Sequence, residues 1–519
     1  MGEERVFVAG EAEISDDGLA GGERGEARRG MSVNCGKPAA PIRLDFGTEV
    51  SATVQARIGY AFRVFAAVYG YRVLEDDSDE AAAVVFYGKS ATSAESRGLT
   101  VPALYTVASP AAGPPHFTKR RYGGEEIPLV FGNDAKNGNP DWLGEIFQWL
   151  SSSHETGIVE RDDVGRIPSL KTVFARNGIS PRKPFASLLM GWMENALRNG
   201  DGEAICRAPS PLAGVQHMVV CSHDIDFYYT NRISALARLI KNWGISFRLY
   251  RSESFFRSNA TMILELLGGK RVGDYVPDLL AAMGKQDFRL TLFVVTRRGH
   301  RRDPNYELTQ MAARLREAEK NGCSVELHGS YTSVLGDGSL KHEAEQLRTA
   351  LARKTLGGRQ HWLRFDSHEK LFAGVREAEL VFDSTLGFPE AAGFRNGAAF
   401  GFPPYNFREE KAHDFLEIPL VVMDGSLEGE SRMEKENAQD IADEVLMESR
   451  EAGWGGVSVL WHNPIEALAV PKEINRVFWN CIERREEFKE RWMSAREFLG
   501  HSLGRYQDAG LLQGVRLDA

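Results

Sequence analysis

The sequence predicts an α/β fold in which parallel strands alternate with amphipathic helices. From about residue 215, short apolar runs alternate with stretches whose apolar residues recur at helical spacing. This alternation is typical of a parallel sheet with helices outside, either doubly wound or closed as a (β/α) barrel. We expect strands at 218–221, 289–296, 324–327, 380–382 and 457–461, and helices at 230–243, 306–320 and 340–354.

Glycine-containing pairs mark the ends of two predicted helices, and further strands and helices are predicted upstream of residue 215. The helices at 306–320 and 340–354 are expected to end at Asn321-Gly322 and Gly357-Gly358. Upstream, residues 82–87 and 127–131 have the pattern of strands, and 142–150 and 185–197 that of helices. We therefore expect a disordered tail at 1–39, an N-terminal α/β domain of unknown role at 40–205, a barrel at 206–470, and a mainly helical C-terminal extension at 471–519.

Composition excludes several classes of protein. The formal net charge of −9 disfavours a general nucleic-acid binder, which needs a basic face. The five cysteines are widely spaced without a CxxC pair, so neither a disulfide framework nor a zinc knuckle is expected. No run of 18 apolar residues predicts a membrane span, and the first thirty residues lack the apolar centre of a secretory signal. We expect a cytoplasmic protein.

Polar residues follow several of the predicted strands, where a barrel carries its functional side chains. Ser222-His223-Asp224-Ile225-Asp226 follows the first strand, and His328-Gly329-Ser330-Tyr331-Thr332 follows the third. His462 follows the last strand. His361 and Arg364 flank the apolar pair at 362–363, which lies between the third and the last of these strands. One carboxylate of the aspartate pair can bind a cation while the other takes a proton from water. This pattern suits metal-assisted hydrolysis of an amide or ester, although an aspartate pair alone could also cap the next helix.

These residues carry a resemblance to a known family. Ser222-His223-Asp224-Ile225-Asp226, His328, Arg364 and Val459-Leu460-Trp461-His462-Asn463, in this order, resemble the motifs of the polysaccharide deacetylase (NodB-like) family. Gly387-Phe388 and Gly393-Phe394-Arg395, leading into Phe402-Pro403-Pro404-Tyr405, resemble one subgroup, in which a segment like 141–166 often precedes the barrel. The resemblance implies a distorted (β/α) barrel, with Asp224 as base, Asp226 and His328 as ligands of a divalent metal, Zn²⁺ foremost, His462 as acid, and Arg364 supporting Asp224.

The sequence departs from the family pattern at one place. The family usually carries a second histidine four residues after the first, where this chain has Thr332. A threonine hydroxyl is a poor zinc ligand beside imidazole. Three alternatives stay open: His361 supplies the third ligand, although a lone histidine beside an apolar pair is more often structural, or the site binds metal weakly, or hydrolysis has been lost.

The resemblance therefore implies a metal-dependent carbohydrate deacetylase, which removes N-acetyl or related acyl groups from an amino sugar or saccharide. Ser330, Tyr331, Arg395 and Tyr405 are the candidate substrate-binding residues. Core packing of the tyrosines, and pairing of Arg395 with Asp383 or Glu390, are equally compatible with the sequence. The alternatives to hydrolysis of a sugar amide are a non-catalytic saccharide-binding protein on the same fold and a deacylase of a non-sugar amide.

Overall fold

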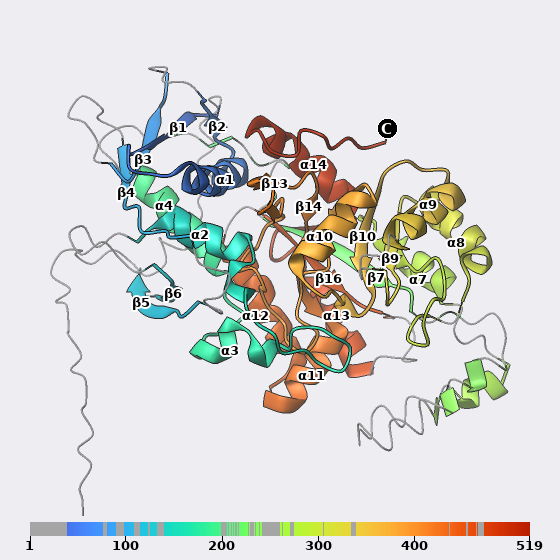
Figure 1. Ribbon diagram of the computed structural model, residues 1–519. Helices are drawn as coiled ribbons and strands as arrows, with labels where there is room; N and C mark the ends of the chain where they lie inside the picture. Colours follow the sequence, from blue (N-terminus) through green and yellow to red (C-terminus); the bar gives the residue numbers. More distant parts are fainter. Residues whose placement is uncertain are drawn as a thin grey trace, which may run out of the picture.

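The structure is a computed structural model, and Figure 1 shows its ribbon. The predicted tail at 1–39 lies outside the described residues apart from residue 39, and so does most of the predicted helix at 230–243. The structure describes residues 39–518 except 76–79, 90–97, 108–114, 123–124, 132–139, 199–204, 206, 209, 211, 213–214, 216, 227, 229–232, 234, 238, 241–259, 262, 270–274, 305, 334–338, 435, 453–454, 463 and 465–471.

The N-terminal region is an α/β unit, as predicted from its sequence. Its four-stranded parallel sheet has the order β2-β1-β3-β4, and β5 and β6 form an antiparallel pair. The Ser51 side chain caps the N-terminus of α1, and Gly70 ends α1 with a positive φ of 68°. The elements are β1 (Pro41–Phe46), α1 (Ala52–Tyr69), β2 (Arg72–Val73), β3 (Ala83–Tyr87), β4 (Gly98–Val101), β5 (Thr118–Tyr122), β6 (Glu125–Leu129), α2 (Trp142–Leu150), α3 (Val173–Asn177) and α4 (Phe185–Arg198), with short 3₁₀ turns at Ser153–Glu155 and Ser169–Lys171.

The second region is a barrel-like α/β unit, which confirms the coarse fold predicted from the alternating pattern. Its main sheet is parallel, has the order β14-β11-β10-β9-β8-β7-β16-β15, and curls into a half-barrel. The elements are β7 (His217–Asp224), α7 (Val276–Met283), β8 (Thr291–Val294), α8 (Leu308–Lys320), β9 (Ser324–Gly329), α9 (Ser339–Leu351), β10 (Leu356–Gln360), a 3₁₀ turn (His361–Leu363), α10 (His368–Glu377), β11 (Leu380–Asp383), β12 (Tyr405–Asn406), β13 (Lys411–Ala412), β14 (Leu416–Glu417), β15 (Leu420–Met423), α11 (Asp424–Glu434), α12 (Ala438–Glu451) and β16 (Gly456–Leu460).

The two outer strands of this sheet are consecutive in the chain. β14 pairs with β11 at one edge, and β15, which starts three residues after β14 ends, pairs with β16 at the other edge. The strands β7, β8, β9 and β16 are buried along their whole length, as expected for a parallel sheet covered by helices. Their carboxyl ends therefore meet on one side of the half-barrel.

Strand β10 corrects one prediction from the sequence. Gly357-Gly358, expected to end the preceding helix, lies inside β10, and the helix ends earlier, at Leu351. A Cβ atom on Gly357 would collide with the ring of Phe382, and one on Gly358 would lie 2.7 Å from Leu380. The glycines are thus needed because the side chains of β11 pack directly against this strand.

The C-terminal extension contains a strand as well as the expected helices. Helices α13 (Lys472–Arg484) and α14 (Ala495–Asp508) flank β17 (Glu490–Met493), which pairs in parallel with the first half of β7. The extension therefore completes the barrel's sheet beside the strand that ends in Asp224. Within the part of the chain that is described, no helix is both long and apolar enough to cross a membrane.

Buried polar contacts join the N-terminal region to the barrel. Arg395 forms an ion pair with Glu155 at 2.8 Å, and both side chains are at most 1% exposed. The backbone N–H of Phe394 donates to the carbonyl of Pro181 at 2.8 Å, an approach that a Cβ atom on Gly393 would block. The motif Gly393-Phe394-Arg395 therefore serves this interface.

Candidate metal centre

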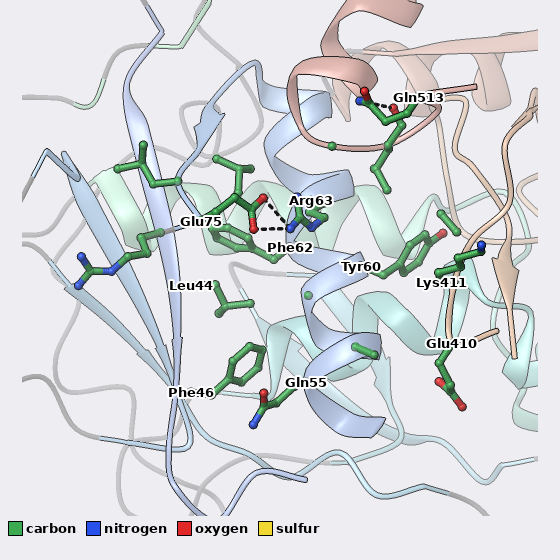
Figure 2. A pocket seen from close by; sticks show the side chains of 18 of the residues that line it. Leu44, Phe46, Gln55, Tyr60, Phe62, Arg63, Glu75, Glu410, Lys411 and Gln513 are labelled. Atoms are coloured by element: carbon green, nitrogen blue, oxygen red, sulfur yellow. Dashed lines mark hydrogen bonds and ion pairs between the residues drawn. The ribbon is translucent and has the colours of Figure 1, made fainter. Parts of the chain in front are cut away.

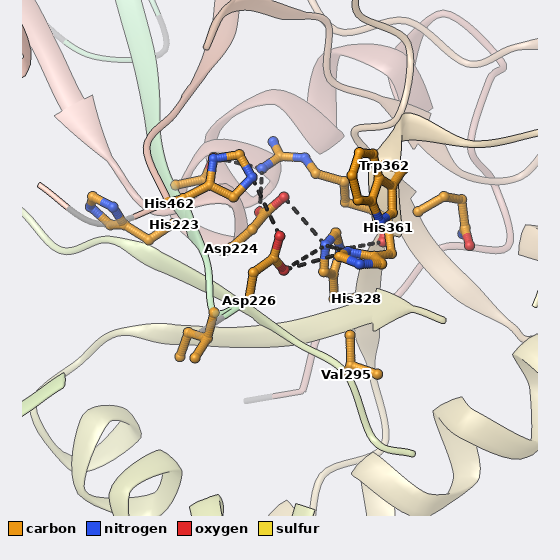
Figure 3. A network of polar contacts seen from close by, with 12 residues as sticks. His223, Asp224, Asp226, Val295, His328, His361, Trp362 and His462 are labelled. Carbon is orange, nitrogen blue, oxygen red and sulfur yellow. Dashed lines mark hydrogen bonds and ion pairs between the residues drawn. The ribbon is translucent and has the colours of Figure 1, made fainter. Parts of the chain in front are cut away.

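The carboxyl ends of four strands bring the predicted chemical residues together (Figure 3). Asp224 is the last residue of β7 and Asp226 follows it, His328 lies in β9, His361 follows β10, and His462 follows β16. Figure 3 shows these side chains pointing toward one another. The clustering follows from the parallel sheet, because residues far apart in sequence share an edge when they end neighbouring strands.

Asp226, His328 and His361 form a group whose geometry fits a metal ion. His361 Nδ1 lies 3.0 Å from His328 Nε2, and Asp226 Oδ1 lies 3.4 Å and 3.5 Å from these two nitrogens. A tetrahedral zinc site with bonds of about 2.0–2.1 Å has ligand atoms about 3.3–3.4 Å apart. Asp226 Oδ1 is buried without a hydrogen-bond partner among the described atoms.

In each of the two histidines, one ring nitrogen bonds a backbone carbonyl, and this bond determines whether the other ring nitrogen carries a proton. His328 Nδ1 lies 2.9 Å from the carbonyl oxygen of Arg359, and His361 Nε2 lies 2.9 Å from that of Arg302. A carbonyl only accepts, so the nitrogen bonded to it carries the proton, and the other two nitrogens face each other as acceptors in the neutral rings. Two acceptors at 3.0 Å repel unless a proton or a cation lies between them.

Electrostatics within this group favour an ionised carboxylate and a bound positive charge. Burial opposes ionisation of Asp226, but His361, His328 and His462 outweigh it and hold the pKa of this carboxyl far below its usual range. For His361, burial disfavours the charged imidazolium and lowers the pKa. For His328, burial is outweighed by Asp224 and Asp226, which raise its pKa, so a proton between the rings would sit on His328.

Asp224 is held by an arginine that the sequence did not single out. Arg359 Nη1 donates to Asp224 Oδ1 at 2.9 Å, and both side chains are almost fully buried. The guanidinium also donates to the hydroxyls of Ser222, Ser384 and Ser458 at 2.9 Å each. This network keeps one oxygen of Asp224 bonded to a cation and leaves Oδ2 on the side of His328, 3.5 Å from Nε2.

Arg364 was expected to support Asp224, and this prediction is wrong because Arg364 contacts other groups. Arg364 donates to the carbonyls of Val164 and Tyr331 at 2.7 Å and 2.8 Å and stacks on the ring of Tyr331 at 4.5 Å. It lies five residues past Arg359 along the chain, beyond the sharp turn at His361–Leu363. Arg359 makes the contact that was expected of Arg364, because its side chain reaches from within β10 to Asp224 at the end of β7, a strand that is not adjacent to β10 in the sheet.

His462 is oriented by a second acid that the sequence reading missed. Its Nδ1 lies 2.8 Å from Asp424 Oδ1, and its Nε2 lies 3.5 Å from Asp226 Oδ2. Asp424 is 1% exposed and also accepts from the backbone N–H of His462 at 2.8 Å. Desolvation opposes protonation, but Asp424, Asp226 and Asp224 raise the pKa of His462 to about 10. The imidazole therefore holds a proton at neutral pH.

Ser330 and Tyr331 are near the cluster but are engaged by other groups. Ser330 is buried, and its Oγ and N–H both donate to Glu343, at 2.5 Å and 2.8 Å, so it is not available to a substrate as predicted. Tyr331 is half-buried; its ring stacks on His300 at 4.4 Å, and its hydroxyl accepts from Arg302 at 2.9 Å. Of these two residues, Tyr331 alone keeps an exposed part.

Arg395 and Tyr405 do not line the cluster, contrary to the prediction that they bind substrate. Arg395 is 1% exposed and pairs with Glu155, not with Asp383 or Glu390. Tyr405 is 3% exposed, donates to Glu410 at 2.8 Å, and packs on Tyr60 with ring centroids 5.0 Å apart. Both belong to the interface between the N-terminal region and the barrel.

Thr332 stands apart from the ligand group, in the turn after β9. The third donor comes instead from His361, which follows the neighbouring strand β10. His223 is fully buried, and its Nδ1 lies 2.9 Å from the carbonyl of Trp461, which fits the structural role expected for it. Burial lowers its pKa to about 4.

Of the two residues that the sequence did not predict, Asp424 and Arg359, only Asp424 had a signal in the sequence. Asp424 directly follows the apolar run Leu420–Met423, just as Asp224 ends the run at 217–224. Arg359 was hidden because the glycine pair before it was interpreted as the end of a helix. A search of every strand end for charged residues would have found Asp424 but not Arg359, which lies inside its strand.

A separate cavity of about 740 Å³ lies in the N-terminal region, between α1, β1 and the segment 510–513 (Figure 2). Its charged side chains pair with one another or with neighbours. Arg63 pairs with Glu75 at 2.6 Å, Arg43 pairs with Asp45 at 2.8 Å, and Glu410 pairs with Arg57 at 2.7 Å. We therefore do not place the chemistry here.

Comparison with models of known protein families and with curated proteins finds no match. The chemical interpretation of the cluster therefore rests on its own geometry and on the motifs in the sequence.

Proposed function

We propose that this protein is a metal-dependent hydrolase that removes N-acetyl or related acyl groups from an amino sugar or another saccharide. One observation carries the proposal. The acceptor nitrogens of His328 and His361 face each other at 3.0 Å beside Asp226 Oδ1, which has no hydrogen-bond partner among the described residues. This donor set favours Zn²⁺ among the common divalent ions, because imidazole and carboxylate are typical zinc ligands.

Asp226, His328 and His361 would hold the ion. A bound zinc ion polarises an acyl carbonyl and lowers the pKa of a bound water. The remaining residues of the cluster move protons. Asp224, kept on Arg359, is placed to accept the proton of the attacking water, and His462, kept on Asp424, is placed to protonate the departing amine. Water and an amide thereby become a carboxylate and an amine.

The saccharide part of the proposal rests on the resemblance of the sequence motifs to the polysaccharide deacetylase family. An exposed aromatic residue beside the cluster supports it. Trp362, the residue after His361, is 44% exposed, and a flat apolar surface suits the face of a sugar ring. The barrel of the deacetylase type is part of the same proposal.

A second candidate is a non-catalytic saccharide-binding protein, which the threonine at position 332 favours. A deacylase of a non-sugar amide is the third, since the geometry of the cluster does not distinguish one amide from another. The three candidates differ in turnover and in substrate, and a single panel separates them.

The test is release of acetate from N-acetylated sugar oligomers and from acetylated polyamines, with zinc supplied. We expect release from the sugars, and losses of about 10²-fold or more in Asp224→Asn and His462→Ala, the scale of general acid–base catalysis. The exposed His342→Ala is the matched control and keeps its rate. Full rates in both site variants contradict the mechanism, release from polyamines alone supports the third candidate, and sugar binding without turnover supports the second.

A further inference from the structure

A loop of the N-terminal region lies on the barrel beside the candidate metal centre. The loop spans residues 161–166, and it contacts the segments that follow β8, β9 and β10. Five hydrogen bonds join the two parts: Arg161 Nη2 to the Asp366 carbonyl at 3.1 Å, Arg166 Nη1 to the Trp362 carbonyl at 3.0 Å, Arg302 Nη1 to the Asp163 carbonyl at 3.3 Å, Arg364 Nε to the Val164 carbonyl at 2.7 Å, and the Tyr331 hydroxyl to the same Val164 carbonyl at 3.4 Å.

The loop is held in shape by Asp162. Its Oδ1 accepts from the backbone N–H groups of Val164 and Arg166 at 3.0 Å and 2.8 Å, and its Oδ2 accepts from Arg166 Nε at 2.7 Å. Gly165 has a φ of +87°, which a glycine adopts without strain. The guanidinium of Arg166 is thus fixed from behind, and its side chain is 15% exposed.

Arg166 holds a strained turn. Trp362 has a φ of +66° and Leu363 one of +50°, a left-handed backbone that is strained for residues other than glycine. Such a conformation persists only where its surroundings determine it. Arg166 bonds the carbonyl of Trp362, at the centre of the turn, and the turn directs the ring of His361 toward Asp226 and His328 (Figure 3).

We propose that Arg166 is a positioning residue of the metal centre, so that the N-terminal region completes the hydrolytic site of the barrel. The inference rests on the proposed metal-dependent function. Without the bond from Arg166, the turn can relax toward ordinary backbone angles, and His361 Nδ1 then leaves its place opposite His328 Nε2. Loss of an outer contact that orients a metal ligand typically weakens metal binding by about 10–100-fold.

The experiment measures zinc affinity of the full chain by competition with a chromophoric chelator, and the absorption spectrum of the Co²⁺ form. We compare Arg166→Met, Arg166→Lys and Arg161→Met with the unchanged protein. Arg161 is the matched control, because it lies in the same loop and also donates to one carbonyl of the barrel. We expect about 10-fold weaker zinc binding and an altered Co²⁺ spectrum in Arg166→Met, a smaller effect in Arg166→Lys, and no change in Arg161→Met.

Equal zinc affinity in Arg166→Met and the unchanged protein overturns the inference, as does equal weakening in Arg161→Met, which indicates a merely structural loop. Absence of zinc binding in the unchanged protein instead overturns the proposed function itself. Should Arg166→Met not give folded protein by its melting transition, Arg166→Lys decides, and an unchanged zinc affinity there overturns the inference.

Discussion

Three chemically active side chains of the cluster, Asp224, His328 and His462, are each fixed by a second group. Arg359 holds Asp224 through its guanidinium and His328 through its carbonyl, and Asp424 holds His462. In this way the site limits the rotation of its acids and bases before any substrate binds, which is how such sites gain precision. Substitution of a supporting residue should therefore lower the catalytic rate, although the acid, base or metal ligand that it supports is still present.

Asp424→Asn is the direct test of this support at His462. The amide cannot supply the negative charge that stabilises protonated His462, so a proton donor is lost at neutral pH. We expect kcat for acyl release to fall by about 10²-fold or more, with zinc affinity unchanged. Asp440→Asn, on the exposed face of α12, is the control. An unaltered kcat in Asp424→Asn contradicts the role of His462 as acid.

A buried acid pair beside the cluster predicts a pH dependence of stability. Asp383 and Glu417 are both fully buried, and burial raises the pKa of each carboxyl, Glu417 further through its contact with Asp383. The folded state therefore keeps a proton that the unfolded chain releases near pH 4. Above that pH the unfolded chain binds fewer protons than the folded one, so stability falls as pH rises through the raised pKa values.

Asp383→Asn removes one of the two carboxyls and should flatten this fall. Urea unfolding between pH 4 and 8 gives the free energy of unfolding for both proteins, and we expect the smaller decline in the variant. A decline of the same size in both would show that the pair does not share a proton in the folded state.

At the scale of elements, strand β10 contributes most to the candidate site. It supplies Arg359 from within the strand, and the turn after it supplies His361 and the exposed Trp362. The sequence predicted the strands β7, β8, β9, β11 and β16 of the same sheet from their apolar runs, because buried parallel strands are largely apolar. It did not predict β10, whose residues Leu356-Gly357-Gly358-Arg359-Gln360 contain one apolar side chain. The close approach of Phe382 to Gly357 and of Leu380 to Gly358 explains those glycines, and no local pattern reveals these contacts.

The interface between the N-terminal region and the barrel contains the buried ion pair Glu155–Arg395, and Arg182–Glu430 is a second buried pair across it. Burial opposes ionisation of Glu155, but Arg395 outweighs it and, with His368, lowers the pKa of this carboxyl to about 2. Glu155→Gln leaves the Arg395 charge buried without a counter-ion, and we expect a loss of about 3–5 kcal/mol in the free energy of unfolding.

Chemical denaturation measures this loss, and Glu160→Gln is its matched control. Glu160 pairs with Arg176 in the same region, but both side chains are more than a third exposed, and such exposed pairs contribute little to stability. Comparable losses in the two variants would show that the interface does not depend on the buried pair.

In the whole molecule, the N-terminal region and the C-terminal extension both contact the barrel close to the strands that carry the candidate site. β17 extends the sheet beside β7, and the loop at 161–166 reaches the turn that carries His361. The sequence predicted the α/β regions and their order from periodicity. It could not predict these contacts, because they join segments about 200 residues or more apart and leave no local pattern. The contact between Arg395 and Glu155 likewise joins distant segments, so the sequence suggested a substrate-binding role for Arg395 although this residue lies in the interface between the N-terminal region and the barrel.

Elemental mass spectrometry of the purified protein shows whether Asp226, His328 and His361 bind a metal ion. Zinc should be measured in the unchanged chain, in Asp226→Ala and His361→Ala, and in His413→Ala, a histidine outside the group. We expect about one zinc ion per chain, lost in the first two variants and kept in the third. No zinc in the unchanged protein after zinc is added back, or full zinc in His361→Ala, would contradict this expectation.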